Sequence, residues 1–283
     1  MNHRNLPTSR GDEALGESAT FVPTRLGRLH VRSIGDGAPT VLWSSMFVDS
    51  HTWDLAVPLL PTGRRYVLVD PPGLGLSEAL RRVSDIAGAA DAATDLLDEL
   101  GVDGPVDWVG NAFGGHVGFK LAARPGVLRS LVAVSSPAQP VPAELRRQIN
   151  LLLPILRTAG PVGSVRSGIL TGMLTDASAA REPIRRVVVE SLARPTRRSM
   201  VLAVRSFILN RVDVTAELAD LTVPSLFVAS DDRGDWSPQD AQAAAALAPD
   251  AEAVTIDAAR TLIPLEQPEK LASHVRRFWD RLA

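Results

Sequence analysis

The stretch that decides the fold is VDWVGNAFGGH, residues 106–116. Its first four residues are typical of a buried strand, Gly110 and Gly114 permit a sharp turn, and a helix follows. The stretch matches the strand–turn–helix pattern Gly-x-Ser-x-Gly, which holds a serine in a strained conformation at the top of a sheet. The serine position here is Ala112, whose methyl group cannot attack a carbonyl carbon. The sequence therefore predicts an active-site scaffold that lacks its attacking atom.

The length and composition of the chain limit the classes of protein to which it can belong. A chain of 283 residues is long enough for one large α/β domain with an insertion. Its net charge of -2 gives no electrostatic indication of a nucleic-acid partner or an anionic membrane. The absence of cysteine excludes disulfides and thiolate metal sites, and we expect no metal and no cofactor. Residues 1–19 lack an apolar signal core, so we expect a flexible arm there and a cytoplasmic protein without a membrane span.

Strand and helix patterns alternate along both ends of the chain. Strands are predicted at 28–33, 40–43, 65–69, 106–109, 130–134, 225–229 and 251–256, and helices at 83–100, 116–123, 238–247 and 266–282. This alternation predicts a parallel sheet covered on both faces. Consecutive helices replace it at 143–158, 162–174, 183–193 and 197–210. We therefore predict an α/β core, residues 20–136 and 215–283, with a helical cap inserted at residues 137–214.

Four sequence blocks carry a resemblance to a known family. They are VLWSSMF (41–47) with HTWD (51–54), VLVDPPGLGLS (67–77), the turn at 110–115, and VPSLFVASDD (223–232) followed by LEQPE (265–269). In this order and spacing they resemble the α/β-hydrolase superfamily with a helical cap. The resemblance implies the α/β-hydrolase fold, with a mostly parallel central sheet flanked by helices. It also implies that the first block holds the oxyanion loop and the last block the catalytic acid and histidine.

The resemblance places a second non-catalytic residue in the site. Counting back from residue 265, the family's histidine position falls on Thr261. The chain's histidines are His3, His30, His51, His116 and His274, and none lies just after the last strand, because His274 falls in the middle of the final helix. The acid position falls on Asp232, with Asp231 and Asp235 as alternatives. Without an imidazole to orient, Asp232 either pairs with Arg260 or serves as an ordinary loop cap.

The backbone groups of the site do not depend on the missing serine and histidine. The resemblance implies that the N–H groups of Met46 and Phe113 form an oxyanion hole, and one such donor contributes about 3–4 kcal/mol in a hydrolase. An enolate carries the same charge on the same oxygen, so the site favours enolisation chemistry. The proton acceptor is then Asp232, a carboxylate of the substrate or water. We favour Asp232 or the substrate over any histidine.

The pocket is predicted to be apolar. Its expected walls are Trp43, Met46, Phe47, Ala112, Phe113 and Trp236, beneath cap residues Leu151, Leu152, Leu153 and Ile155. The further substrate contacts predicted here are Ser44, Ser45, His51 and Arg260. This composition indicates a hydrophobic small molecule or a peptide-derived substrate.

Three functions remain open at this point. The lost Ser and His also resemble the atypical α/β-hydrolase-fold epimerase of bottromycin biosynthesis, which implies epimerisation of an aspartate beside a thiazoline in a modified peptide by substrate-assisted deprotonation. The first function is therefore a non-hydrolytic epimerase or isomerase of a natural-product intermediate. The second is a pseudoenzyme that binds a hydrophobic ligand. The third is an esterase inactivated by replacement of serine with Ala112. Ser44 or Ser45 as a substitute nucleophile lacks a base nearby.

Overall fold

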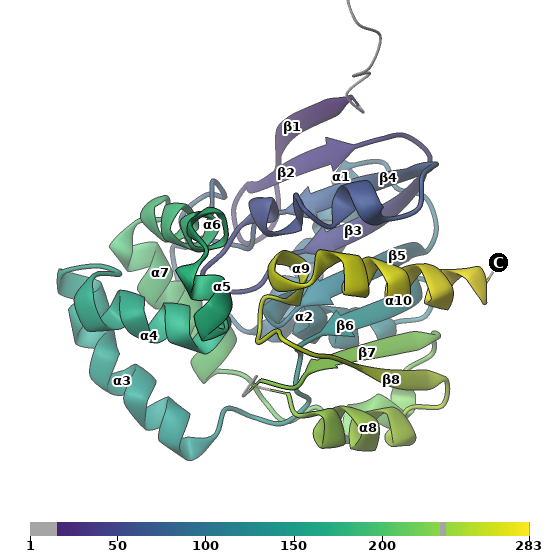
Figure 1. The fold of residues 1–283 in the computed structure, drawn as a ribbon. Helices are drawn as coiled ribbons and strands as arrows, with labels where there is room; N and C mark the ends of the chain where they lie inside the picture. Colours follow the sequence, from purple (N-terminus) through teal and green to yellow (C-terminus); the bar gives the residue numbers. More distant parts are fainter. Residues whose placement is uncertain (1–15, 233–235, 283) are drawn as a thin grey trace, which may run out of the picture.

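The computed structural model describes residues 16–232 and 236–282, and an eight-stranded sheet forms the centre of the molecule (Figure 1). The strand order is β1-β2-β4-β3-β5-β6-β7-β8. The strands are β1 (Glu17–Val22), β2 (Leu29–Ile34), β3 (Ala38–Trp43), β4 (Arg64–Val69), β5 (Val106–Asn111), β6 (Leu128–Val134), β7 (Ser225–Ser230) and β8 (Ala251–Ile256). β2 pairs antiparallel with β1 and β4, whereas β3 to β8 are parallel to one another. The predicted fold class is confirmed.

Helices cover both faces of the sheet. α1 (Ile86–Glu99), α2 (Phe113–Ala122) and α8 (Pro238–Leu247) pack on one face, and α10 (Pro268–Asp280) packs on the other. The alternation of side chains along a strand separates the two cores. Val41 and Trp43 of β3 belong to the core beneath α1 and α2, whereas Leu42 faces the core beneath α10. The strands are therefore apolar on both sides, as expected for a covered parallel sheet.

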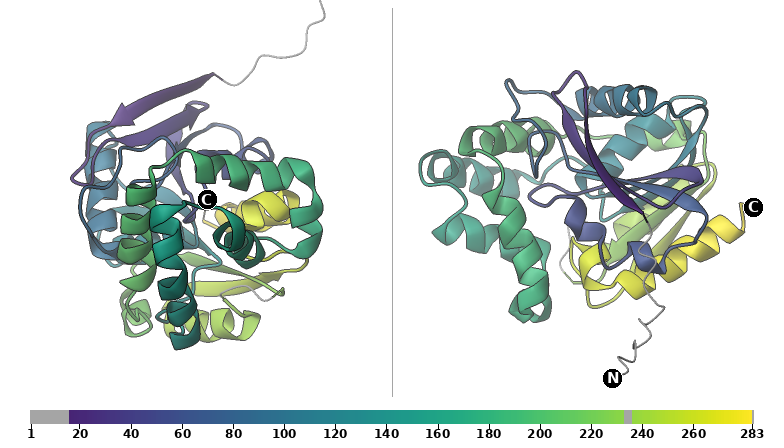
Figure 2. Two further views of the ribbon diagram at one scale, coloured as in Figure 1. Left: turned by 90° about the vertical axis from the view of Figure 1, so that its left-hand side faces the viewer. Right: turned by 90° about the horizontal axis from the view of Figure 1, so that it is seen from above.

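The consecutive helices form a cap at one end of the sheet, between β6 and β7 (Figure 2). They are α3 (Ala143–Thr158), α4 (Gly163–Met173), α5 (Asp176–Ala180), α6 (Glu182–Ala193), α7 (Arg197–Ala203) and the π-helical turn η3 (Val204–Leu209). Buried hydroxyls join the cap to the core. Ser199 Oγ accepts a hydrogen bond from Leu80 N at 2.9 Å, and Ser206 Oγ accepts one from Ser84 N at 2.8 Å. The cap is thus held directly above the carboxyl ends of the central strands.

Some element boundaries differ from the sequence predictions. The predicted arm reached residue 19, but β1 begins at Glu17; its first five residues are exposed, so they lack the alternation that marks a half-buried strand. The rest of the predicted arm lies outside the described residues. The five-residue helix α5 was not predicted because it is too short to show an apolar repeat at i, i+3, i+4 and i+7. The last predicted helix, 266–282, begins instead at Pro268 as α10, and Glu266 belongs to a separate short helix, α9 (Ile263–Glu266).

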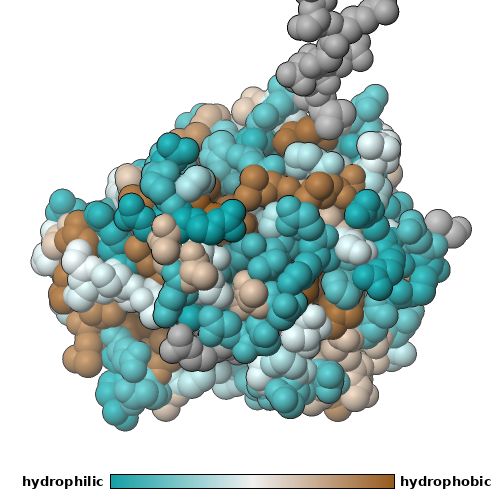
Figure 3. Space-filling model, in the orientation of Figure 1, coloured by the Kyte–Doolittle hydropathy of each residue, from teal (hydrophilic) through white to brown (hydrophobic). Residues whose placement is uncertain are grey.

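The surface of the cap is partly apolar. In Figure 3 hydrophobic residues gather on the side where the cap lies, and Leu151 and Ile155 of α3 are among the exposed large hydrophobic side chains. Within the part of the chain that the structure describes, no helix has the length and apolar character needed to cross a membrane.

Candidate functional site

The turn after β5 has the geometry that its sequence predicts. Ala112 lies between β5 and α2 with φ 47° and ψ -102°. An alanine in this region of backbone space costs of order 1–3 kcal/mol. The turn is also too tight for side chains at its glycines, because a Cβ added to Gly110 would lie 2.1 Å from the carbonyl carbon of Gly114. The elbow is therefore retained in a strained form, and it presents a methyl group.

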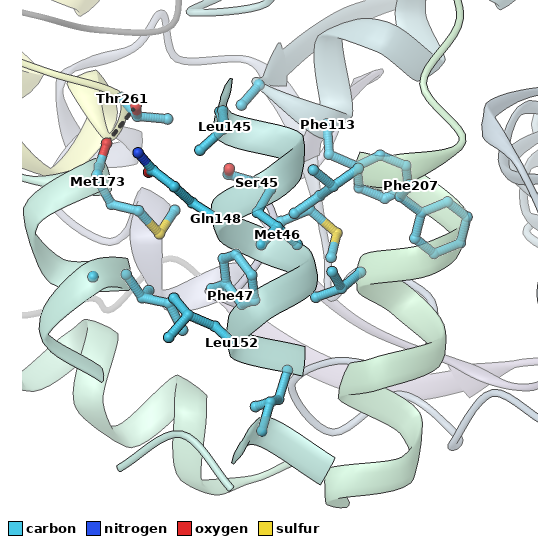
Figure 4. Close-up of a pocket in the computed structure, with 18 of the residues that line it drawn as sticks. Ser45, Met46, Phe47, Phe113, Leu145, Gln148, Leu152, Met173, Phe207 and Thr261 are labelled. Carbon is cyan, nitrogen blue, oxygen red and sulfur yellow. Dashed lines mark hydrogen bonds between the residues drawn. The ribbon is translucent and has the colours of Figure 1, made fainter. Parts of the chain in front are cut away.

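A cavity of about 250 Å³ lies above the elbow and beneath the cap (Figure 4). The core contributes Ser45, Met46, Phe47, Ala112, Phe113, His116 and Thr261 to its wall. The cap contributes mainly apolar side chains, among them Leu152, Leu153 and Leu156 of α3, Ile169 and Met173 of α4, and Phe207 of η3. Polar side chains are few, and they include Gln148 of α3 and Arg211 just after η3. Such a wall suits an apolar ligand with a small number of directing polar groups.

Two backbone donors at this cavity have no protein acceptor. No described residue accepts a hydrogen bond from the N–H of Met46 or from that of Phe113. Phe113 N belongs to the first residue of α2, where the helix itself supplies no acceptor. Both residues are almost fully buried. A ligand oxygen that reaches them would satisfy donors that the protein leaves unpaired.

The loop that carries Met46 is held from below. Ser50 N donates to Asp70 Oδ1 at 2.8 Å, and Asp49 caps the short helix η1 (Ser50–Trp53) by accepting from His51 N at 3.1 Å. Phe47 adopts φ 67°, a left-handed conformation that a bulky residue rarely takes. The surrounding hydrogen bonds therefore hold the backbone next to Met46 in an energetically unfavourable conformation.

The cap also contacts this loop. Arg194, at the end of α6, forms an ion pair with the buried carboxylate of Asp49. Burial raises the pKa of Asp49, and the nearby carboxylate of Asp70 raises it further, whereas the Arg194 guanidinium opposes the shift. Asp70 shows the opposite net shift: burial raises its pKa, but the hydrogen bonds from His30, Leu76 and Ser50 lower it more. Arg194 thus links the position of the cap to the loop that holds Met46.

His116 is the histidine nearest to the elbow. It lies in the first turn of α2, is 6% exposed and lines the cavity. Its Nε2 hydrogen-bonds to the carbonyl oxygen of Pro137 at 3.0 Å, which requires the proton on Nε2. Burial lowers the pKa of His116 to about 3, and the positive charge of Arg211 contributes. His116 is therefore a neutral wall residue and a weak base.

The predicted acid does not line the cavity. Asp232 borders a separate depression on the surface, and its Oδ2 accepts a hydrogen bond from Arg260 Nη2 at 2.9 Å. This pairing of Asp232 with Arg260 is one of the two alternatives that the sequence left open. Arg260 is 2% exposed and also lies outside the cavity wall. Of the acid–histidine block, Thr261 alone among these three residues reaches the cavity.

The residues around Thr261 fasten the cap to the core. Thr261 Oγ1 donates to the carbonyl of Gly172 at 3.1 Å (Figure 4). Arg260 Nη1 donates to the carbonyl of Leu174 at 2.6 Å, and Arg260 N donates to Glu266 Oε2 at 2.8 Å. The other oxygen of Glu266 accepts from Thr175 N at 2.8 Å. We call these residues, Arg260, Thr261 and Glu266 with cap residues 171–175, the cap clasp. The clasp includes Thr261, the position at which the family resemblance placed the catalytic histidine.

Several predicted contacts lie elsewhere. Trp43 is buried and lies outside the cavity wall, where it stacks on Trp108. Trp236 packs in the core against Phe119 and Phe227 rather than in the cavity wall. Both are large apolar groups near the sheet edge, and sequence alone does not separate the core from the wall above it.

The remaining predicted contacts outside the wall are polar or exposed. Ser44 is buried and accepts a hydrogen bond from Trp53 Nε1 at 3.2 Å. His51 is partly exposed and pairs with Asp54, which raises its pKa. In α3, Leu151 is 70% exposed and Ile155 is 39% exposed, and neither lines the cavity.

Sequence reasoning missed the cap residues Gln148, Met173, Phe207 and Arg211. Figure 4 shows Gln148 and Met173 near Thr261, with Phe207 on the opposite side of the cavity beside Phe113. The rings of Phe113 and Phe207 stack with their centroids 4.5 Å apart. The only available signal was the amphipathic pattern of the cap helices, which marks an inner face without saying whether it meets the core or a cavity. In the described ranges, 16–232 and 236–282, no group of three or more metal-ligating side chains could hold a metal ion.

The sheet order, the strained elbow and the inserted cap together define an α/β-hydrolase-fold protein. A comparison with family models agrees, since residues 37–274 match the model of the alpha/beta hydrolase family. The chain belongs to this family.

Known relatives and structures are consistent with this assignment. The chain is 30% identical over 208 residues to the putative carbamate hydrolase RutD of Stutzerimonas stutzeri, covering 72% of this chain and 77% of that protein. It is 27% identical over 213 residues to a pimeloyl-[acyl-carrier protein] methyl ester esterase of Shewanella woodyi, covering 71% and 77%. The enol-lactonase of Burkholderia xenovorans superposes with a TM-score of 0.83 at 20% identity, covering 92% of this chain and 100% of that one. A thermophilic esterase of Thermogutta terrifontis gives the same TM-score at 23% identity, covering 93% and 98%. These relatives are named as hydrolases, and the structural likenesses show the fold.

Proposed function

We propose that this protein is a non-hydrolytic enzyme that stabilises an enolate, and that it epimerises or isomerises a hydrophobic carbonyl compound. The observation that carries the proposal is the pair of unpaired N–H donors, Met46 and Phe113, beside the methyl group of Ala112. Donors in this arrangement stabilise charge on a carbonyl oxygen whether the oxygen belongs to a tetrahedral intermediate or to an enolate. Because the elbow carries alanine, it offers no serine hydroxyl that could form the tetrahedral intermediate.

The proton acceptor is proposed to come with the substrate. No described residue of the cavity wall is a carboxylate, and His116 is held neutral with its Nε2 proton committed to Pro137. Asp232 is engaged by Arg260 outside the wall. A carboxylate on the substrate, held near the acidic C–H, gains the advantage of proximity, which is worth about 7–11 kcal/mol in well-oriented systems. The C–H proton moves to the substrate carboxylate, its electron pair moves to the carbonyl oxygen, and a proton delivered from solvent water to the opposite face inverts the carbon.

Deuterium exchange tests this function directly. The probe is a short apolar peptide that ends in an aspartate α-methyl ester, so that the acidic α C–H lies next to a carbonyl, incubated with the protein in deuterated water. We expect deuterium at the aspartate α-carbon, inversion of that centre and no cleavage. The matched control is the same peptide with asparagine, which keeps the shape but removes the carboxylate, and exchange should fall to the uncatalysed rate. Equal exchange from both peptides would contradict substrate assistance.

A binding module is the second candidate function, and one observation favours it. The described wall of the cavity contains no group suited to act as a general base near neutral pH. Saturable binding of both peptides, with no exchange and no turnover from either, would establish ligand binding in place of catalysis.

The esterase alternative is tested by restoring the serine. Ala112→Ser puts a hydroxyl on the same strained backbone, but Thr261 supplies no imidazole to remove its proton. We expect hydrolysis of p-nitrophenyl butyrate to stay within about tenfold of the unsubstituted protein, because a triad without its base loses most of its activity. The double variant Ala112→Ser/Thr261→His is the matched comparison. Rapid ester hydrolysis by Ala112→Ser alone would revive the esterase function.

A further inference from the structure

Ser45 presents an unpaired hydroxyl to the cavity. It follows β3 directly, precedes Met46 and is only 1% exposed, yet it lines the cavity together with Ala112. No described residue forms a hydrogen bond with its Oγ, and this oxygen is not among the polar atoms sealed away in the interior. Figure 4 shows Ser45 among the labelled wall residues, between Gln148 and Met46. The hydroxyl thus faces the space where a ligand would lie.

The neighbouring serines differ from Ser45 in this respect. Ser44 Oγ accepts from Trp53 Nε1 at 3.2 Å. Ser136 Oγ donates to the carbonyl of Val134 at 2.9 Å, and Ser135 Oγ donates to the carbonyl of Arg260 at 3.3 Å. These three hydroxyls have protein partners, whereas Ser50 Oγ and Ser230 Oγ have none among the described residues but, unlike Ser45 Oγ, are sealed in the interior. A buried hydroxyl without a partner calls for another explanation, and a missing ligand supplies one.

We infer that Ser45 Oγ is a third donor to the substrate carbonyl oxygen, beside the backbone N–H groups of Met46 and Phe113. This inference rests on the proposed function and names a further residue for it. An oxygen that gains negative charge on enolisation accepts additional hydrogen bonds, and a hydroxyl rotates freely enough to supply one. The substrate is accordingly a carbonyl compound whose oxygen reaches the end of β3.

Ser45 keeps its proton throughout this step. The C–H bond of the substrate breaks, its proton moves to the substrate carboxylate, and the electron pair becomes the enolate, whose oxygen accepts from Ser45 Oγ–H. The role differs from that of a serine nucleophile, which requires a base to remove the hydroxyl proton. The only histidine in the described wall, His116, has its Nε2–H committed to the Pro137 carbonyl.

The carbonyl stretching frequency of a bound ketone tests the assignment without requiring turnover. The probe is acetophenone labelled with ¹³C at its carbonyl, recorded by infrared difference spectroscopy. Each hydrogen bond to the oxygen lowers the frequency. We expect the stretch to shift down on binding, and to shift back up in Ser45→Ala. Ser44→Ala is the matched control, since it removes a neighbouring hydroxyl that does not line the cavity, and it should leave the frequency unchanged. Equal frequencies for the unsubstituted protein and Ser45→Ala, or no shift on binding, would overturn the inference.

A rate measurement separates this inference from the function on which it rests. If the peptide probe exchanges deuterium, Ser45→Ala should slow exchange about 10²-fold, the usual effect of removing one donor. Normal exchange with an unchanged carbonyl frequency overturns the role of Ser45 and leaves the enolising function intact. A Ser45-dependent frequency with no exchange in any variant supports Ser45 as a carbonyl donor and counts against enolisation. Ser45→Cys, which keeps a weak donor, should give an intermediate frequency and provides the same test if Ser45→Ala does not fold.

Discussion

The elbow and the cap clasp occupy neighbouring parts of the same sheet edge, but they treat their polar groups differently. At the elbow, the N–H groups of Met46 and Phe113 and the hydroxyl of Ser45 have no partner among the described residues, and all three residues line the cavity. At the clasp, Arg260 and Glu266 are nearly fully buried and bonded to backbone groups of the cap. Unpaired buried donors weaken a fold, whereas bonded ones stabilise it. From this difference we infer that the elbow binds a ligand, whereas the clasp holds the cap on the core.

The difference also bears on how the cavity forms. A catalytic histidine must face the substrate, but Thr261 turns its hydroxyl to the end of α4 and Arg260 reaches the carbonyl groups beyond it. The cap is held on the opposite side by Arg194, which pairs with Asp49 below the Met46 loop. With the cap fixed at both places, the wall above Ala112 is in place before a ligand arrives. Preorganisation of this kind is what electrostatic stabilisation of an enolate requires.

The largest expected effect comes from breaking the clasp. Arg260→Leu removes the guanidinium that bonds Asp232 and the carbonyl of Leu174, so buried acceptors lose their donor. We expect a loss of about 3–5 kcal/mol in the free energy of unfolding, measured by urea denaturation. Arg276→Ala, on the exposed side of α10, is the control and should change stability by less than about 0.5 kcal/mol. A loss below about 1 kcal/mol for Arg260→Leu would remove the distinction between the two regions.

A second prediction concerns His116 on the elbow side. Its pKa in the folded protein is about 3, below the ordinary 6.5, so between these values the unfolded chain binds the proton and the folded protein does not. The free energy of unfolding therefore falls as the pH drops through this window. His116 alone should cost about 2 kcal/mol at pH 5 relative to pH 8. In His116→Gln, which retains a donor for Pro137, this part of the pH dependence should vanish.

Urea titrations of both proteins at pH 8 and pH 5 measure this difference. Other titrating groups contribute equally to the pH dependence of stability in the two proteins, so their contributions cancel in the difference. Identical losses of stability in both would mean that His116 is accessible to protons, and a protonatable imidazole at the elbow would then have to be considered as a base.

The fold and the elbow were predictable because they depend on local patterns. The helix at 143–158 and the strand at 251–256 were predicted with the boundaries observed, since each has a clear period. Helix 238–247 was also predicted, where Ser237 caps the first turn and Pro238 begins the helix. The turn at Ala112 followed from glycines whose spacing leaves no room for side chains.

The cavity wall was harder to predict because it depends on how distant elements pack. The run LLLPIL in α3 contains both exposed and buried residues: Leu151 points outward, whereas Leu153 lines the cavity. Hydropathy does not separate them. Trp236 was expected in the wall, but Phe119 and Phe227 from other elements enclose it in the core. Gln148 carries no chemical motif, and only the placement of α3 over the elbow brings it to the cavity.

The prediction with the smallest expected effect concerns the backbone strain at Ala112 in the elbow. Ala112 has a positive φ that costs of order 1–3 kcal/mol for a residue with a side chain, whereas glycine adopts it without that cost. Ala112→Gly should therefore stabilise the protein by about 1 kcal/mol, after the larger backbone entropy of glycine, about 0.5–1 kcal/mol, is subtracted. Ala243→Gly is the matched control at an exposed position of α8 and should destabilise by about 1 kcal/mol. Changes of opposite sign in the free energy of unfolding, from the same Ala→Gly substitution, would show that the fold holds Ala112 under strain. Equal losses of stability would show that the turn is relaxed, and the elbow would then not be held in place for a ligand.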